Sequence, residues 1–333
     1  EDLIAIARLV HMAGVFGRNI VLSSATIPPD LALGLYQSYQ DGLVCYNAFA
    51  DEKKTLQAMW VDEFRSECSR IPLNDVKSYA EQHEAFVKKR AKKLSTQIIK
   101  RKAKLISCQP QENVEKAWQL YVKAIQHAVL SLHAEHHVED KQTKKKVSFG
   151  LLRFANIDPC VNMSISLAKT DWGKDTAIYL MCYHSRQVLL LRHEQERYLD
   201  SVLRRKQEQG DIVDFKDKIV RQKLTQTSAD HVIFLVVSTP VEEIGRDHDF
   251  DWAVIEPSSY RSIIQLAGRI RRHRPLPYDI VQPNIGVMEF NWRAMRNPHT
   301  QNSVFEHPGF EKRGRYLLKS HDMYNGPMNS DQN

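Results

Sequence analysis

The feature that most constrains the fold is a series of near-continuous apolar segments between residues 147 and 290, separated mostly by helical or mixed segments. They read VSFGLLRFAN, TAIYLMCY, VIFLVVS, WAVIEP and IGVMEF. Strands that are apolar along their whole length are buried on both faces, as in a parallel sheet covered by helices. We therefore expect an α/β fold with a parallel sheet and helices on both faces.

Polar residues follow these segments at their carboxyl ends, where the working residues of such sheets gather. Residues 184–186 (HSR) follow TAIYLMCY, and residues 239–247 (TPVEEIGRD) follow VIFLVVS. Near the amino end, a helix is expected over residues 2–13, and then NIVLSSATIPPD predicts a short buried strand that ends at residues 24–26. A simple turn would be enough to connect each of these strands to the next element, yet polar side chains follow each strand. We therefore expect a functional site at these strand ends.

The stretch from about residue 50 to 145 has a different character, because long polar helices are expected in it. KKRAKKLSTQIIKRKAKL, from Lys88 to Leu105, holds nine Lys or Arg and no acid, and we expect it to be solvated surface that could also contribute to DNA binding. Apolar residues at helical spacing from Val114 to Leu132 predict a helix that packs on the body of the protein.

The stretch QLAGRIRRHR, residues 265–274, concentrates positive charge after one glycine. Gln265, Gly268, Arg269 and Arg272 lie at i, i+3, i+4 and i+7, which is one stripe of a helix. Glycine in a helix interior costs about 1 kcal/mol, so we expect something, such as a phosphate, to approach the backbone there. The alternative is a solvated basic face. Arg271 and Arg274 point away from the stripe and are expected to be surface charge.

Composition limits the compartment and the partners. The 333 residues include 47 Lys or Arg against 40 Asp or Glu, and the sequence pI of about 9.0 fits a polyanionic partner. The five cysteines are scattered and form no C-x-x-C pair, so neither a disulfide framework nor a zinc site is indicated. No apolar run reaches the roughly 18 residues of a membrane helix. We expect a cytoplasmic protein with no membrane partner.

Four short motifs, SSAT, YHSR, STPVEEIGRD and QLAGRIRR, resemble in this order motifs III, IV, V and VI of superfamily 2 helicases. Three longer stretches are similar in sequence to the CRISPR-associated helicase-nuclease of type I systems, in its subtype I-F form. They are VSFGLLRFANIDPCV, EEIGRDHDFDWAVIEPSSYRSIIQLAGRIRRHR and FEHPGFE. This resemblance implies two RecA-like lobes that clamp ATP and move 3′ to 5′ on single-stranded DNA, together with a nuclease that degrades invader DNA. The domains would then be the end of the first lobe (1–50), a helical insertion or linker (51–146), the second RecA-like lobe (147–292) and the start of a carboxyl-terminal extension (293–333).

The resemblance also implies roles for individual residues. Arginines that reach a transferred phosphoryl group speed its hydrolysis, and Arg269 and Arg272 match them, with Gln265 holding them in place. The remaining matches fall into three groups: ATP binding by Gly245, Asp247 and Gly268; DNA contact by Thr239, His184, Ser185 and Arg186; and coupling of nucleotide state to lobe closure by Ser24 and Thr26.

Other parts of such an enzyme have no match in this chain. No phosphate loop G-x-x-x-x-G-K-[ST] is present, because WGKD (172–175) lacks the first glycine and the hydroxyl residue. No acidic magnesium-binding motif precedes SSAT. ATP, Mg²⁺ and the divalent metals of an HD nuclease would therefore be bound mainly by motifs upstream, and the chain alone is expected to be inactive. We do not expect a metal site at any of three His- and Asp-containing stretches: residues 247–249 (DHD), His321-Asp322 and HAEHHVED (133–140).

The resemblance further implies single-stranded DNA, a CRISPR RNA-guided surveillance complex and, in subtype I-F, the CRISPR integrase as partners. Two alternatives stay open. One is a second-lobe remnant that binds nucleic acid or a partner and hydrolyses nothing. The other is a different superfamily 2 motor, against which the wording VSFGLLRFANIDPC and DHDFDWAVIEPSS argues.

Overall fold

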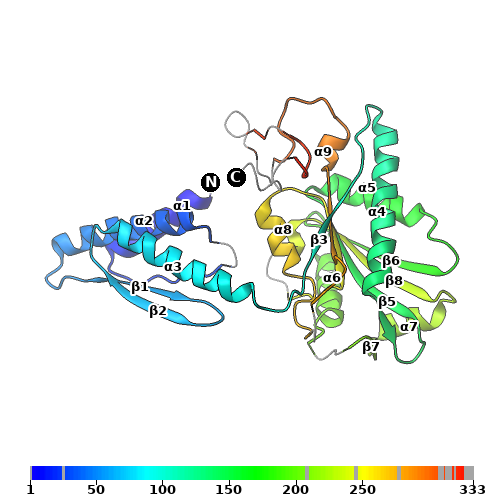
Figure 1. Ribbon diagram of the computed structural model, residues 1–333, viewed down its shortest axis with the longest axis horizontal. Helices are drawn as coiled ribbons and strands as arrows, with labels where there is room; N and C mark the ends of the chain where they lie inside the picture. Colours follow the sequence, from blue (N-terminus) through cyan, green and yellow to red (C-terminus); the bar gives the residue numbers. More distant parts are fainter. Residues whose placement is uncertain are drawn as a thin grey trace. The chain divides into compact units, whose positions relative to one another are not determined.

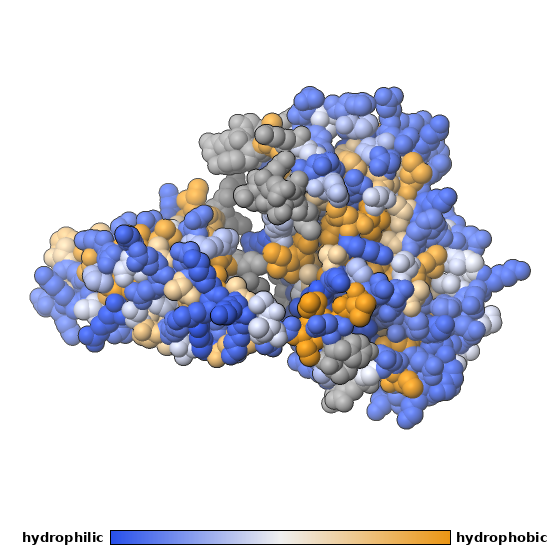
Figure 2. Space-filling model, in the orientation of Figure 1, coloured by the Kyte–Doolittle hydropathy of each residue, from blue (hydrophilic) through white to orange (hydrophobic). Residues whose placement is uncertain are grey.

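The computed structural model describes residues 2–24, 27–206, 210–243, 247–275, 279–306, 311, 317–318 and 320–325. The chain divides into two compact units, Glu1–Gln97 and Ile98–Asn333 (Figure 1), and each is described by itself. Among the described residues, no helix combines the length and the apolar character that a membrane crossing requires. Hydrophilic side chains cover much of the face that Figure 2 shows, with apolar ones between them.

The described part of the first unit contains three helices and a hairpin: α1 (Asp2–Val15), α2 (Pro29–Phe49), β1 (Leu56–Val61), β2 (Ser66–Ile71) and α3 (Val76–Leu94). The helices α1 and α2 approach closely at Gly14 and Gly42, because a Cβ on either glycine would overlap backbone atoms of the other helix. β1 and β2 pair antiparallel, and their apolar residues pack with α2 and α3 around Trp60 and Phe86.

The second unit is built on a mostly parallel sheet with β5 (Lys146–Arg153) near its middle. On one side of β5, β8 (His231–Ser238) and then β6 (Thr176–Tyr183) pair parallel. On the other side follow β9 (Trp252–Ile255), β10 (Ile285–Met288) and β3 (Ala103–Ile106), also parallel. The short strands β4 (Val138–Asp140) and β7 (Ile212–Val213) extend the sheet at the beginning of β5, where β4 is antiparallel to it.

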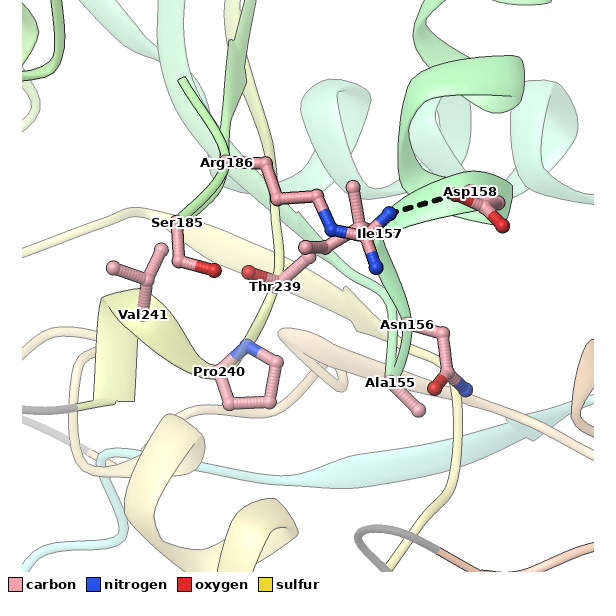
Figure 3. Close-up of a pocket in the computed structure, with 9 residues that line it drawn as sticks. All are labelled: Ala155, Asn156, Ile157, Asp158, Ser185, Arg186, Thr239, Pro240 and Val241. Atoms are coloured by element: carbon pink, nitrogen blue, oxygen red, sulfur yellow. Dashed lines mark ion pairs between the residues drawn. The ribbon is translucent and has the colours of Figure 1, made fainter. Parts of the chain in front are cut away.

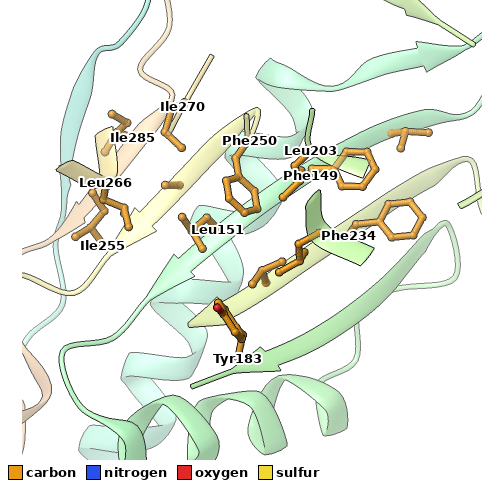
Figure 4. Packing of buried hydrophobic residues seen from close by; sticks show 14 of the residues in the cluster. Phe149, Leu151, Tyr183, Leu203, Phe234, Phe250, Ile255, Leu266, Ile270 and Ile285 are labelled. Carbon is orange, nitrogen blue, oxygen red and sulfur yellow. The ribbon is translucent and has the colours of Figure 1, made fainter. Parts of the chain in front are cut away.

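Helices cover both faces of this sheet. One apolar layer joins the strands to α6 (Leu189–Val202), α7 (Lys218–Gln226) and α8 (Tyr260–Ala267) (Figure 4). The opposite layer joins them to α4 (Val114–His136) and α5 (Ile157–Lys169). Along β8, Val232, Phe234 and Val236 face the first layer, while the residues between them face the second. This alternation of two buried faces confirms the α/β fold expected from the apolar strands. The remaining elements are the single-turn η1 (Pro240–Glu243) and α9 (Trp292–Met295).

The structure differs from the sequence predictions in the first 146 residues. The stretch 51–146 is neither one unit nor helical throughout: it contains the β1–β2 hairpin, and its part after Gln97 belongs to the second unit, where β3 and β4 join the sheet. The basic stretch from Lys88 is helical only to Leu94 and ends in β3.

The short buried strand expected in NIVLSSATIPPD is also wrong within the described residues. Residues 18–24 have no regular secondary structure, and the Val21 side chain is 91% exposed. The physical reason is the lack of a partner, since the described strands of this unit, β1 and β2, pair with each other.

Candidate functional site

The carboxyl ends of β5, β6 and β8 meet at one edge of the sheet, and the loops that follow them enclose a pocket of about 510 Å³ (Figure 3). Thr239 follows β8, and Ser185 and Arg186 follow β6, so the structure brings together three residues that the sequence placed at separate strand ends. The backbone N–H of Thr239 donates to the carbonyl of Tyr183 at 3.3 Å, which ties the end of β8 to the end of β6.

The wall opposite Ser185 is the loop after β5, residues 155–158, where α5 begins at Ile157. The side chain of Asn156, at the N-cap, makes no capping hydrogen bond. The amino end of a helix presents backbone N–H groups and a partial positive charge, which favour anions. Sequence reasoning missed these residues as a site, although the polar Asn156 and Asp158 follow strand β5 as polar residues follow the other strands.

The charged pair in the pocket is Arg186 and Asp158, whose side chains lie 3.7 Å apart and are 73% and 85% exposed. Exposed pairs of this kind contribute little to stability, so the guanidinium can exchange its carboxylate for a ligand oxygen. The hydroxyl groups of Ser185 and Thr239, the helix N–H groups and the exposed guanidinium of Arg186 suit a phosphate oxygen.

Glu256 fixes the position of the loop that follows β5, residues 155–158. Its carboxylate is buried and accepts the N–H of Ala155 at 2.6 Å and the N–H of Trp292 at 2.8 Å. Burial raises the pKa of Glu256, while the hydrogen bonds and nearby arginines oppose that rise. The pocket wall is therefore held by a buried group rather than by the loop alone.

His184 is separated from this pocket, although it precedes Ser185. Its backbone N–H donates to Oε1 of Gln187 at 3.2 Å, and it is not among the pocket-lining residues. Burial, followed by the charge of Arg186, lowers the pKa of His184. A neutral imidazole is a weak partner for a phosphate, so Arg186 supplies the positive charge here.

The arginine motif does not form the single helical stripe that its spacing predicts. α8 ends at Ala267, and Gly268 caps it by donating its N–H to the carbonyl of Ile264 at 3.0 Å. The nearest neighbour of a Cβ on Gly268 would be the carbonyl of Gln265 in its own helix. Gln265 thus lies in the last turn, whereas Arg269 and Arg272 lie on the irregular chain beyond the helix.

Arg269 and Arg272 nevertheless differ from the other arginines of the motif. Arg269 is buried, its Nη2 donates to the carbonyl of Glu243 at 3.0 Å, and burial followed by the charge of Arg272 lowers its pKa. The Nε of Arg272 lies 3.1 Å from Asp247, and its side chain is 37% exposed. Asp247 is thus paired with an arginine.

Arg274 corrects the expectation that it is surface charge. It is buried, and its guanidinium pairs with Asp249 at 2.8 Å and with Asp251 at 2.5 Å. The histidine of the DHD sequence is equally engaged: His248 contacts Glu242 at 2.5 Å and Asp200 at 3.1 Å. Among the other expected site residues, Ser24 is exposed in the first unit, and Thr26 and Gly245 lie outside the described residues.

Comparison with known proteins agrees with the resemblance seen in the motifs. Residues 146–275 match the family model described as CRISPR-associated nuclease/helicase Cas3, C-terminal. The chain is 37% identical over 328 residues to the CRISPR-associated nuclease/helicase Cas3 subtype I-F/YPEST of Pseudomonas aeruginosa (strain UCBPP-PA14), covering 97% of this chain and 30% of that protein. The protein of the same description from Pectobacterium atrosepticum is also 37% identical, over 330 residues, covering 97% of this chain and 29% of that protein. The chain therefore spans about a third of the length of the curated relatives it matches.

Solved structures support the fold. The crystal structure of T. fusca Cas3-ADP has a TM-score of 0.51 and 15% identity, and the match covers 86% of this chain and 28% of that one. The crystal structure of T. fusca Cas3 gives the same TM-score at 16% identity, again over 86% of this chain and 28% of that one. These matches agree with a RecA-like α/β fold.

Proposed function

We propose, from the match of residues 146–275 to the Cas3 C-terminal family model and from the identity to the Cas3 relatives, that the chain supplies the second RecA-like lobe of an ATP-dependent translocase. The motor moves 3′ to 5′ on single-stranded DNA and, with an HD nuclease elsewhere in the protein, degrades invader DNA in CRISPR interference. The observation that carries the proposal is the pocket in which Thr239, Ser185 and Arg186 face the amino end of α5. Its groups suit the DNA backbone and read no sequence.

ATP is proposed to bind against the arginine motif. Arg269 and Arg272 stabilise the charge of the transferred phosphoryl group, and Gln265, Gly268, Gly245 and Asp247 are proposed to serve the same ATP site. The ion pair between Arg272 and Asp247 supports this role, because an arginine in a half-exposed ion pair can exchange its carboxylate partner for a phosphate oxygen. Mg²⁺ and the triphosphate are held mainly by motifs outside this sequence, so the chain alone turns over no ATP above background.

The first unit is proposed to contain the end of the first lobe, at residues 1–50. Apolar side chains of α1 support this, since Leu3, Ile4 and Leu9 are 54%, 65% and 71% exposed. An apolar helix face of this size is normally covered, and here the rest of that lobe would cover it. Ser24 and Thr26 are then proposed to couple nucleotide state to lobe closure.

The longer protein is proposed to act with a CRISPR RNA-guided surveillance complex, which delivers the DNA, and with the CRISPR integrase of subtype I-F. The divalent metals belong to the HD nuclease. A second-lobe remnant that only binds nucleic acid predicts the same DNA pocket but no hydrolysis. DNA-stimulated ATP turnover by the longer protein therefore decides between the two.

DNA binding by the pocket is tested with fluorescently labelled oligo(dT) and the chain itself, at several salt concentrations. Each phosphate contact on a single strand steepens the dependence of log affinity on log salt by about 0.7. We expect Arg186→Ala to weaken binding and to reduce that slope by about one such step. The matched control is Arg197→Ala, since Arg197 is also exposed and pairs with a carboxylate at 3.0 Å, in α6 away from the pocket. Equal losses in both variants would show non-specific attraction and refute the pocket.

A further inference from the structure

Arg153, the last residue of β5, has a fully buried guanidinium group. Its Nε contacts the carboxylate of Glu243 at 2.8 Å, and its other nitrogens donate to the hydroxyls of Ser258 and Ser262, both at 2.8 Å, and to the carbonyl of Glu256 at 3.2 Å. A buried ion pair of this kind can often be replaced by apolar side chains with no loss of stability. The stability of the fold therefore does not explain why residue 153 is an arginine. The fixed geometry of its contacts gives a reason instead.

The partner of Arg153 in turn holds Arg269. The carboxylate of Glu243 also accepts the hydroxyl of Ser262 at 2.9 Å, so this side chain is bonded from both sides. Its backbone carbonyl is the group that accepts the guanidinium of Arg269 at 3.0 Å. Within the described residues, the Nε of Arg269 has no hydrogen-bond partner, so the bond from its Nη2 to the carbonyl of Glu243 orients this guanidinium.

The same short segment also reaches the DNA pocket. η1 spans Pro240–Glu243, so Thr239 and Pro240 line the pocket at one end of this turn while Glu243 holds Arg269 at the other. Arg153 lies two residues before Ala155 on the opposite wall of the pocket. Both walls are therefore tied to Glu243, one through the single turn of η1 and one through the guanidinium of Arg153.

We propose that Arg153 is a positioning residue that sets Arg269 for ATP hydrolysis and links the occupancy of the DNA pocket to that arginine through Glu243. The inference rests on the proposed function of the two sites, and Arg153 itself touches neither ATP nor DNA. Only arginine suits the position, because a planar fork can bond a carboxylate and two hydroxyls together, whereas lysine has a single nitrogen.

The test is Arg153→Lys in the full-length protein, measured by ATP turnover with and without single-stranded DNA. A small displacement of a catalytic group can cost about 100-fold in rate, and we expect DNA-stimulated kcat to fall about 10- to 100-fold. KM for ATP and the DNA affinity without nucleotide stay within about twofold. Ser262→Ala removes two hydrogen bonds and keeps the ion pair, and it should lower kcat in the same way with a smaller effect.

The matched control is Arg221→Lys, because Arg221 forms a comparable fork with Asp140, at 2.8 and 2.9 Å, near the beginning of β5 rather than its end. It should leave kcat within about twofold of wild type. A loss equal to that of Arg153→Lys would mean general destabilisation and would overturn the proposal, as would an unchanged kcat in Arg153→Lys.

Hydrogen exchange separates this inference from the proposed function, because it needs no ATPase activity. Peptides covering residues 239–243 and 266–271 should exchange about tenfold faster in Arg153→Lys, since their mutual bonding is lost, while those covering α7 stay unchanged. If wild type hydrolyses no ATP, the proposed function fails, and exchange alone decides the role of Arg153. Unchanged exchange in both peptides overturns it in either case.

Discussion

Arg274→Met should destabilise the second unit strongly, although the residue lies in a run of arginines that reads as surface. The guanidinium is buried between Asp249 and Asp251 and also donates to the carbonyl of Phe250 at 3.1 Å. Removing one partner of a buried ion pair costs about 3–5 kcal/mol, because the remaining charge is left uncompensated. Asp251 keeps Arg205 at 2.8 Å, so Asp249 accounts for much of the loss.

The pH dependence of that loss gives its cause. Burial raises the pKa of Asp249, but Arg274 and Arg205 outweigh it, so the folded pKa lies below the ordinary value of 3.8. In wild type, this carboxylate stabilises the fold above the unfolded pKa, and the contribution is lost as pH falls through the lower folded pKa. Without Arg274, burial dominates and the folded pKa rises, so the charged form destabilises at neutral pH and protonation relieves it. The cost of Arg274→Met should therefore be smaller at pH 5 than at pH 7.

Urea unfolding followed by tryptophan fluorescence measures this, since four of the five tryptophans lie in the second unit. Arg197→Met is the control, because Arg197 and Glu194 form an exposed pair of a kind worth about 0–1 kcal/mol. A cost for Arg274→Met below about 1 kcal/mol, or one that is equal at pH 5 and pH 7, would refute the reasoning from buried charge.

Two further predictions concern packing and hydrolysis. A Cβ on Gly150 would overlap the six-membered ring of buried Trp252, so Gly150→Ala should lower the free energy of unfolding by about 1–3 kcal/mol. In a double-mutant cycle, the same Gly150→Ala change made in a Trp252→Phe background should cost much less unfolding free energy. An equal cost in both backgrounds would mean that the overlap with Trp252 is not the source of the strain. In the full-length protein, Arg272→Ala should lower ATP turnover by about 10³-fold or more. Arg272→Lys should be defective as well, because lysine lacks the bidentate fork. Small and equal losses of turnover on replacing Arg269 and Arg272 would mean that both are solvated surface charges.

The sheet and its candidate pocket could be predicted from the sequence because their signals are local. The apolar runs of β5 and β8 are buried on both faces and that of β6 is partly buried, and the apolar character of each strand is visible in its letters. Since the strands are parallel, their carboxyl ends share one edge, and this brings Thr239 to Ser185 and Arg186. The same rule applied to the end of β5 would also have identified the wall at residues 155–158.

The basic segments could not be predicted in the same way because distant partners decide their structure. Residues 88–105 have a helical composition, but their last part becomes β3 by pairing with β10, about 180 residues later. After α8, the chain bends because Phe250 exchanges backbone hydrogen bonds with Arg269 and Arg271, both at 2.9 Å. Arg271 accordingly has a φ of 46°, which ends the helical spacing on which the predicted stripe relied.

The arginines of QLAGRIRRHR show why charge composition alone could not separate a catalytic motif from a basic surface. Arg274 faces two buried aspartates and is fixed by them, so it is unsuited to contact a ligand. Arg269 is buried and bonded through one nitrogen to a backbone carbonyl, and Arg272 is half-exposed and pairs with Asp247. These two are the arginines that we propose to contact a phosphate. The bend after α8, rather than helical periodicity, therefore decides the different surroundings of the arginines in this motif.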